Sequence, residues 1–301
     1  MNDFLNYINC LAQHKLSAGK DKTANNYCCA ARALALFLTF EEKPKVLPFS
    51  ELTPWLVERF EAYLLSERGV RRNTSSAYMR SLQAAWNAAA REGYAVAGVN
   101  PFAYVYTGVD KTRHRATDQD SLLQLFSACL DDNPKLAFTR DIFIFSFLCR
   151  GMAFVDIAKL HKRDICDGSI CYVRSKTGQK LCVRISAAME SIINRWGDPT
   201  SPYLLPVVAL PFTQCRYNSA LRTYNRRLRE LTKRLGIDEN ITSYTARHSW
   251  ASEAYQLQVP VSVISTCMGH TTESTTRIYL RSLDNKYVDD CAAVVEQYFI
   301  R

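Results

Sequence analysis

Apolar side chains recur at helical spacing along most of this chain of 301 residues, and one polar, basic stretch interrupts the pattern. Three segments ahead of the interruption have the spacing of amphipathic helices, and the second opens with a Thr-Pro helix start: "KTANNYCCAARALALFLTF", "TPWLVERFEAYLLSERG" and "NTSSAYMRSLQAAWNAAAREG". The interruption, "TGVDKTRHRATDQDS", is typical of a linker between domains. The pattern therefore predicts an all-helical domain over 1–106, a linker over 107–116 and a second domain over 117–301.

The second domain is expected to be mostly helical with one β insertion. The stretch "SICYVRSKTGQKLCVRI" alternates apolar and polar residues on both sides of a Lys-Thr-Gly-Gln turn, which predicts a hairpin. Thr117 and Asp120 have the spacing of a capping box and predict that the next helix begins there. "LAFTRDIFIFSFLC" is expected to be a buried helix, and "CRYNSALRTYNRRLRELTKRLG" a strongly basic one. The predicted fold class is mainly α (α+β), with two helical domains and a small β-sheet or hairpin in the second.

Composition bears on partners more than on fold. The chain has 38 Lys and Arg against 29 Asp and Glu, a balance that favours polyanions such as nucleic acid. The N-terminal stretch lacks the pattern of a signal peptide, and no run of about 18 apolar residues predicts a membrane span. The eleven cysteines form no CxxC pair and have no histidines at zinc spacing. We therefore expect reduced thiols in a cytosol, no metal site and no membrane partner.

Two segments of the C-terminal third concentrate chemically active side chains: "YTARHSWASEA" and "CMGHTTESTTRIYL". They contain Arg247, His248, His270 and Tyr279, with 23 positions from Arg247 to His270 and nine from His270 to Tyr279. A single histidine or tyrosine of this kind is usually a packed core residue. An arginine suits a phosphodiester, because its guanidinium stays charged and binds two phosphate oxygens as a fork. A tyrosine hydroxyl is a nucleophile only when nearby cations assist it.

These two segments resemble the signature of the tyrosine recombinases, also called phage integrases, and both spacings fit that family without a gap. The first domain resembles their helical, SAM-like core-binding domain, so the resemblance covers nearly the whole chain. It implies that Tyr279 attacks a DNA phosphate to form a 3′-phosphotyrosine ester, while Arg247 and His270 hold the phosphate. In the family a hairpin lysine protonates the leaving 5′ oxygen, and Lys176 matches it, with Lys180 as the second choice. No cofactor is implied.

The sequence departs from the family pattern at two places. The family's box begins with a histidine three residues before the arginine, and Tyr244 stands there. A neutral phenol is a poor base but can donate a hydrogen bond, so Tyr244 is interpreted as a phosphate contact. His248, next to Arg247, fits the second histidine that usually follows the box, and we expect it to support the site.

The second departure concerns the family's first arginine, which belongs at the position of Ala153 when Gly151 and Asp156 are aligned with the pattern. Arg150 lies one helical turn earlier and is long enough to substitute, with Arg174 of the hairpin as its rival. Asp156 is expected to brace the site rather than react.

The resemblance also implies partners. These are double-stranded DNA with specific recombination sites and three further copies of the chain, which form a homotetramer on paired sites from free monomers. The expected location is the cytoplasm, on the nucleoid. The apolar pattern of residues 286–301 predicts an amphipathic tail helix, which could pack on its own domain. The resemblance implies instead that this helix docks on a neighbouring protomer. The basic side chains expected to contact DNA are Lys22, Arg71, Arg72, Arg80, Arg113, Arg226 and Arg227. Two other functions remain open: a type IB-like topoisomerase and a non-catalytic DNA-binding relative.

Overall fold

The structure is a computed structural model that describes residues 3–44, 46–95, 100–110 and 116–280. Contacts within the chain divide it into two compact units, Met1–Thr112 and Arg113–Arg301. Each unit has its own apolar core, and each is described by itself. No helix among the described residues is both long and apolar enough to cross a membrane.

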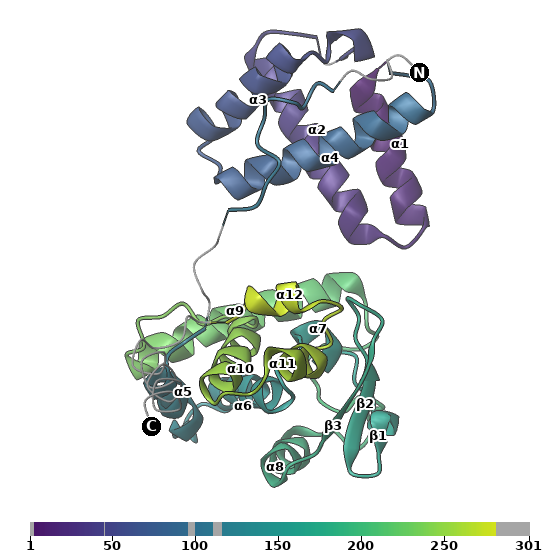
Figure 1. The fold of residues 1–301 in the computed structure, drawn as a ribbon. Helices are drawn as coiled ribbons and strands as arrows, with labels where there is room; N and C mark the ends of the chain where they lie inside the picture. Colours follow the sequence, from purple (N-terminus) through teal and green to yellow (C-terminus); the bar gives the residue numbers. More distant parts are fainter. Residues whose placement is uncertain (1–2, 45, 96–99, 111–115, 281–301) are drawn as a thin grey trace, which may run out of the picture. The chain divides into compact units, whose positions relative to one another are not determined.

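The elements that the structure describes in the first unit are all helices, joined by loops (Figure 1). Its elements are α1 (Phe4–Ser17), α2 (Asp21–Phe40), a 3₁₀ turn (Phe49–Glu51), α3 (Pro54–Ser66) and α4 (Arg72–Arg91). The Thr-Pro start of α3 is confirmed, because the Thr53 hydroxyl accepts a hydrogen bond from the Leu56 N–H at 3.3 Å. Helices α1 and α4 both pack against α2 around rings such as Phe4, Phe37 and Trp86.

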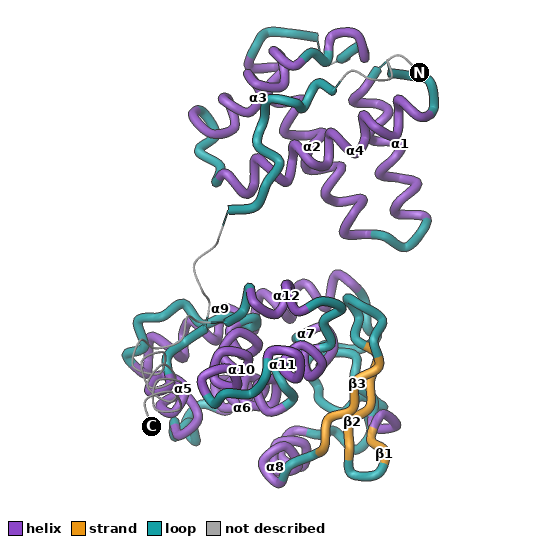
Figure 2. Tube along the Cα trace, viewed as in Figure 1, coloured by secondary structure: helices purple, strands orange, loops and turns teal. Residues whose placement is uncertain are grey.

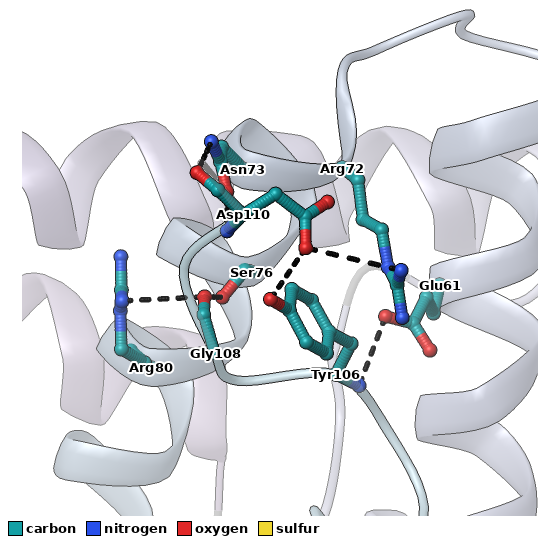
Figure 3. Close-up of polar contacts among 8 residues, drawn as sticks. All are labelled: Glu61, Arg72, Asn73, Ser76, Arg80, Tyr106, Gly108 and Asp110. Carbon is teal, nitrogen blue, oxygen red and sulfur yellow. Dashed lines mark hydrogen bonds and ion pairs between the residues drawn. The ribbon is translucent and has the colours of Figure 1, made fainter. Parts of the chain in front are cut away.

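After α4 the chain returns to the surface of that helix, and a set of polar contacts holds residues 106–110 there (Figure 3). The Asn73 side chain binds both backbone groups of Asp110, donating to its carbonyl at 3.0 Å and accepting from its N–H at 2.8 Å. The Ser76 hydroxyl donates to the Gly108 carbonyl at 2.5 Å, and the Tyr106 hydroxyl donates to the Asp110 carboxylate at 2.6 Å. This segment therefore belongs to the first unit.

The second unit combines helices with a small antiparallel sheet of order β1-β2-β3, drawn in orange in Figure 2. Its helices are α5 (Gln119–Ser127), α6 (Pro134–Leu148), α7 (Phe154–Ile157), a 3₁₀ turn (Lys162–Asp164), α8 (Ala187–Trp196), α9 (Gln214–Leu235), α10 (Thr245–Gln256), α11 (Val261–Met268) and α12 (Glu273–Arg277). Its strands are β1 (Ile165–Cys166), β2 (Ser169–Val173) and β3 (Lys180–Arg184). The mainly helical fold with a predicted hairpin is confirmed.

Helix α6 is the central element of this unit, as its apolar sequence predicts. It packs against α8, α9 and α10. Its one buried carboxylate, Asp141, is paired with Arg140 at 2.7 Å and accepts from the Trp196 indole N–H at 2.7 Å, so the charge is compensated.

The capping box predicted at Thr117 is wrong. Asp118 caps α5 instead, because its carboxylate accepts from the Ser121 N–H at 2.8 Å. The Thr117 hydroxyl is engaged elsewhere, donating to the Glu239 carboxylate at 2.5 Å.

The prediction that all cysteines are reduced thiols also differs from the structure. Cys171 of β2 and Cys182 of β3 lie directly opposite each other in the ladder and form a disulfide. The other described cysteines, among them the exposed Cys166 of β1, are free. The sequence alone does not show the pairing, because it depends on the register of the two strands.

Candidate active site

Arg247 lies in the first turn of α10 and is almost fully buried, with 3% of its surface exposed. Its Nη1 donates to the Gly151 carbonyl at 2.9 Å, and its Nη2 donates to the Met268 carbonyl at 2.5 Å. Its Nε is buried and has no hydrogen-bond partner among the described residues. A buried cation with an unused N–H is costly unless an anion completes it. This arginine is therefore held in place by two backbone carbonyls and keeps one N–H for an anion.

Gly151 permits this close approach. It has a φ of +70°, and a Cβ added there would lie 2.6 Å from the Cα of Arg247. Glycine is consequently required twice over, for the left-handed conformation and for the contact between the chain after α6 and α10.

His270 follows the left-handed Gly269 that ends α11. Its Nε2 lies 3.0 Å from Arg247 Nη2, and its Nδ1 lies 2.9 Å from the Thr276 hydroxyl oxygen. Because a guanidinium N–H can only donate, Nε2 must accept, and the neutral ring carries its proton on Nδ1 for Thr276 to accept. Burial, followed by the cations Arg247, Arg174 and Lys176, lowers the pKa of His270 to about 3, so the ring is neutral at pH 7.

Tyr279 lies just after α12 in an apolar pocket and is 5% exposed. Its ring centre is 4.5 Å from that of His248 and 5.2 Å from that of His270. The Ser252 hydroxyl of α10 donates to the Tyr279 carbonyl at 3.0 Å and fixes the backbone there. The predicted set of Arg247, His248, His270 and Tyr279 is thus brought together by α10, α11 and α12.

Tyr244, at the N-terminus of α10, contacts the hydroxyl of Tyr279. The two phenolic oxygens are 2.5 Å apart. Burial, and then the hydrogen bond to Tyr279, raise the pKa of Tyr244 to about 12. Tyr244 therefore remains protonated over the physiological range and can donate to the Tyr279 oxygen. Sequence reasoning assigned Tyr244 to the phosphate and did not anticipate this contact between two tyrosines.

The β2–β3 hairpin brings a second arginine to the same place. Arg174 is buried, and its Nη1 donates to the Gly269 carbonyl. The Asp156 carboxylate accepts from the Ser175 N–H at 2.9 Å, which ties the hairpin turn to α7. Lys176 is exposed on that turn, close enough for its charge to act on His270.

Arg150 is half-buried and has a φ of +58°, directly before Gly151. Among the described residues its guanidinium has no hydrogen bond or ion pair. Arg174, by contrast, acts electrostatically on Arg247, Tyr244 and His270. The contacts favour Arg174 over Arg150 as the second arginine of the site.

The charged groups that act on His270 are Arg247, Arg174 and Lys176, and all are cations. Three positive charges around a neutral imidazole and a buried phenol form a binding site for an anion with several oxygens. A nucleophilic hydroxyl beside such a site suits attack on a phosphodiester.

Of the predicted DNA contacts, two already have partners inside the first unit (Figure 3). The Arg72 guanidinium stacks 3.9 Å from the centre of the Tyr106 ring and lies 3.9 Å from the Asp110 carboxylate. Arg80 Nη1 reaches the carbonyls of Thr107 and Gly108 at 3.5 Å. Both arginines remain exposed.

The remaining predicted DNA contacts are in varied settings. Lys22, Arg71 and Arg226 are exposed, and Arg227 is half-buried. Arg113 lies outside the described residues.

Sequence reasoning missed four residues of the site: Gly151 as a packing position, Ser175, Ser252 and Thr276. Thr276 is fully buried. Its only sequence signal is a position three residues before Tyr279 within the quoted motif, which does not distinguish it from neighbouring threonines.

Comparison with known proteins gives matches to both units. Residues 115–286 match the model of the phage integrase family, and residues 3–105 match the phage integrase SAM-like domain. A tyrosine recombinase of Thermosipho africanus is 37% identical over 67 residues, which cover 22% of this chain and 24% of that protein. One of Pseudothermotoga lettingae is 34% identical over 109 residues, which cover 36% of this chain and 35% of that protein. The matched stretches thus span about a quarter and about a third of these curated relatives.

Solved structures share the fold. A lambda integrase tetramer bound to a Holliday junction superposes with a TM-score of 0.70 at 16% identity, covering 93% of this chain and 79% of that one. The Tn1549 transposon integrase in complex with a circular intermediate DNA has a TM-score of 0.69 at 15% identity, covering 99% and 100%. At these identities the likeness concerns the fold.

Proposed function

This chain belongs to the phage integrase family of tyrosine recombinases, and we propose that it is a site-specific recombinase that cleaves and rejoins duplex DNA through a covalent bond between Tyr279 and a 3′ phosphate. The observation that carries the proposal is that the Tyr279 ring lies against Arg247 and His270, while Arg174 and Lys176 act on the same His270. Such a set of cations stabilises the charge that develops on a phosphorus under attack.

The cleavage step follows from these positions. Tyr279 gives its phenolic proton to solvent, and its oxygen attacks phosphorus to form the new P–O bond. The bond from phosphorus to the 5′ oxygen breaks, and the Lys176 ammonium gives that oxygen a proton, which solvent later restores. The phosphotyrosine ester retains the energy of the broken bond, so the reverse reaction rejoins a strand without ATP.

Each supporting residue has a separate task in this proposal. Arg247 and Arg174 bind the non-bridging phosphate oxygens, while neutral His270 holds Arg247 in position. Tyr244 donates a hydrogen bond to the Tyr279 oxygen and thereby stabilises the charge on that oxygen during the attack. Asp156 holds the hairpin turn through Ser175. The substitution of Arg150 for the displaced family arginine stays a prediction, and the contacts favour Arg174.

DNA and further copies of the chain are the proposed partners. The formal net charge of +9 and the basic helix α9 suit contact with a phosphate backbone. The lambda integrase, as its structure is described, forms a tetramer on a Holliday junction, and we expect the same assembly here on paired sites, in the compartment that holds the chromosome. The tail helix predicted over residues 286–301, which would dock between protomers, lies outside the described residues.

The test is covalent trapping. Purified protein is incubated with sheared DNA of its host, the reaction is stopped with detergent, and the DNA that stays bound to protein is sequenced. We expect enrichment of a small number of related sites with the wild type and none with Tyr279→Phe, which retains the ring and binds DNA. Enrichment of scattered sequence, together with relaxation of supercoiled plasmid and no recombinant joints, would favour the topoisomerase reading. DNA binding without any adduct would favour the non-catalytic one.

A further inference from the structure

The disulfide between Cys171 and Cys182 occupies a particular position in the β2–β3 ladder. At the turn, the Arg174 N–H donates to the Gln179 carbonyl at 2.9 Å, and at the open end the Ile185 N–H donates to the Gly168 carbonyl at 2.8 Å. Hydrogen-bonded pairs alternate with non-hydrogen-bonded pairs along an antiparallel ladder. Counting from either end, Cys171 and Cys182 form a non-hydrogen-bonded pair, the kind in which opposing Cα atoms are closest. Their Cα atoms are 4.2 Å apart, so the register itself brings the two sulfurs together.

Small thiols can reach this pair. Cys182 is exposed and Cys171 is half-buried. Both line a cavity of about 470 Å³ that is open at the surface beside α7 and the hairpin. Access matters because thiol–disulfide exchange requires attack by a thiolate in line with the sulfur–sulfur bond.

The same hairpin supplies the active site. The segment between the two cysteines contains Arg174 and Lys176. The hairpin packs so closely on Gly269 that an added Cβ there would lie 2.9 Å from the Leu181 side chain of β3 and 3.3 Å from the Arg174 side chain. In the structure the hairpin with the disulfide formed holds Arg174 at the Gly269 carbonyl, next to His270.

We propose that Cys171 and Cys182 form a reversible redox pair, and that its disulfide form holds the hairpin in the arrangement that cleaves DNA. The second half of this statement rests on the proposed function. In reducing compartments disulfides are uncommon, and those that form are usually transient or redox-sensing. The exposed Cys182 and the open cavity beside the pair give small thiols access, so this pair can open and close with the thiol pool.

The chemistry is an exchange with a low-molecular-weight disulfide such as oxidised glutathione. The Cys182 thiolate attacks one glutathione sulfur, which forms a mixed disulfide and releases one glutathione. The Cys171 thiolate then attacks the Cys182 sulfur and releases the second glutathione. In total two protein thiols become one disulfide, and one oxidised glutathione becomes two reduced molecules. Reduced glutathione reverses both steps.

Reduction removes the cross-link but leaves the strands paired. The part of the ladder between the cysteines and the turn can then open more often, and each opening displaces Arg174 and Lys176. A displacement of about 1 Å at a reacting centre can cost up to ~10²-fold in rate. We expect cleavage by the reduced protein to be at least about threefold slower.

The experiment uses full-length protein equilibrated with oxidised or reduced glutathione and then alkylated. Peptide mapping by mass spectrometry should find Cys171 linked to Cys182 in the oxidised sample and both alkylated in the reduced one. Amide hydrogen exchange in residues 169–184 should be faster after reduction. Formation of the covalent adduct on the trapped DNA should be faster for the oxidised protein. Cys166→Ser is the matched control, because Cys166 is exposed on the neighbouring strand and lies opposite Ser169.

The double variant Cys171→Ser, Cys182→Ser should cleave at the reduced rate in both buffers, whereas Cys166→Ser should respond like the wild type. Absence of the linked peptide from the oxidised sample overturns the redox pair. A linked peptide with equal adduct rates in both buffers overturns the coupling to cleavage. A linked peptide with no adduct in either buffer contradicts the proposed function, and with it the coupling, and leaves the pairing intact.

Discussion

Replacing Tyr244 by phenylalanine removes one hydroxyl group and tests how the nucleophile is prepared. In the structure that hydroxyl is 2.5 Å from the Tyr279 oxygen, and the raised pKa of Tyr244, about 12, keeps its proton in place. A hydrogen bond to a charged oxygen is worth ~1.5–3 kcal/mol. Loss of this bond should therefore slow attack by about 10- to 150-fold, since 1.36 kcal/mol corresponds to a factor of ten.

The effect should fall on the rate and not on binding. The variant loses a contact to the attacking oxygen only, so cleavage should slow while the affinity for the DNA duplex stays at the wild-type value. The other groups around Tyr279 are His248 and Arg247 of α10 and His270 after α11, and all are retained in the variant. Arg174 and Lys176 of the hairpin, which act on His270, are retained as well.

The assay is single-turnover adduct formation on a nicked duplex carrying the trapped site, measured beside the binding affinity for the same duplex. Tyr255→Phe, on the same helix, is the matched control and should behave like the wild type. Tyr244→His, which restores the family's usual residue, should recover more activity than Tyr244→Phe. A loss of binding as large as the loss of rate would mean that Tyr244 only packs, and an unchanged rate would refute the reasoning altogether.

Three further predictions concern the surrounding groups. Arg174→Ala should lower the rate of adduct formation by ~10²–10³-fold and Arg150→Ala by less, and the reverse order would return the role to Arg150. Gly151→Ala should lower the free energy of unfolding by about 1–3 kcal/mol more than Gly178→Ala does. Both glycines have a φ of +70°, but only an alanine at position 151 would contact Arg247. Equal losses in chemical denaturation would contradict the packing argument. Burial and three cations hold the pKa of His270 at about 3, so below pH 6.5 the unfolded chain binds a proton that the native ring does not. The free energy of unfolding should therefore fall as the pH drops from 6.5 towards 3, and it should fall less steeply in His270→Gln. Parallel pH profiles of the two proteins would show that His270 is not responsible.

Local patterns in the sequence were sufficient for most elements. The Thr53–Pro54 start fixed the beginning of α3, and alternation around the Lys-Thr-Gly-Gln turn located β2 and β3, because each signal depends on neighbouring residues only. The motif residues Arg247, His270 and Tyr279 were found from their match to the spacing of a family signature, and the structure brings them together.

Contacts between distant segments were the part that the sequence did not reveal. Thr117 has the spacing of a cap, but Glu239 lies within reach of its hydroxyl and engages it. The Cys171–Cys182 pair requires the register of two strands, and the contact of Tyr244 with Tyr279 requires the packing of α10 against the segment after α12. Arg174 is likewise brought to the site by the hairpin's approach to Gly269, so residue spacing favoured Arg150.

The identity of the nucleophile is the central claim, and the neighbouring hydroxyl of Tyr244 makes it necessary to test it by direct mapping. The trapped adduct is digested with nuclease and trypsin, and the peptide that retains a nucleotide is sequenced by mass spectrometry. The proposal predicts a 3′-linked nucleotide on Tyr279, in the tryptic peptide that begins at Ile278. A nucleotide on Tyr244, in the peptide that begins at Leu235, or on any other residue would contradict it.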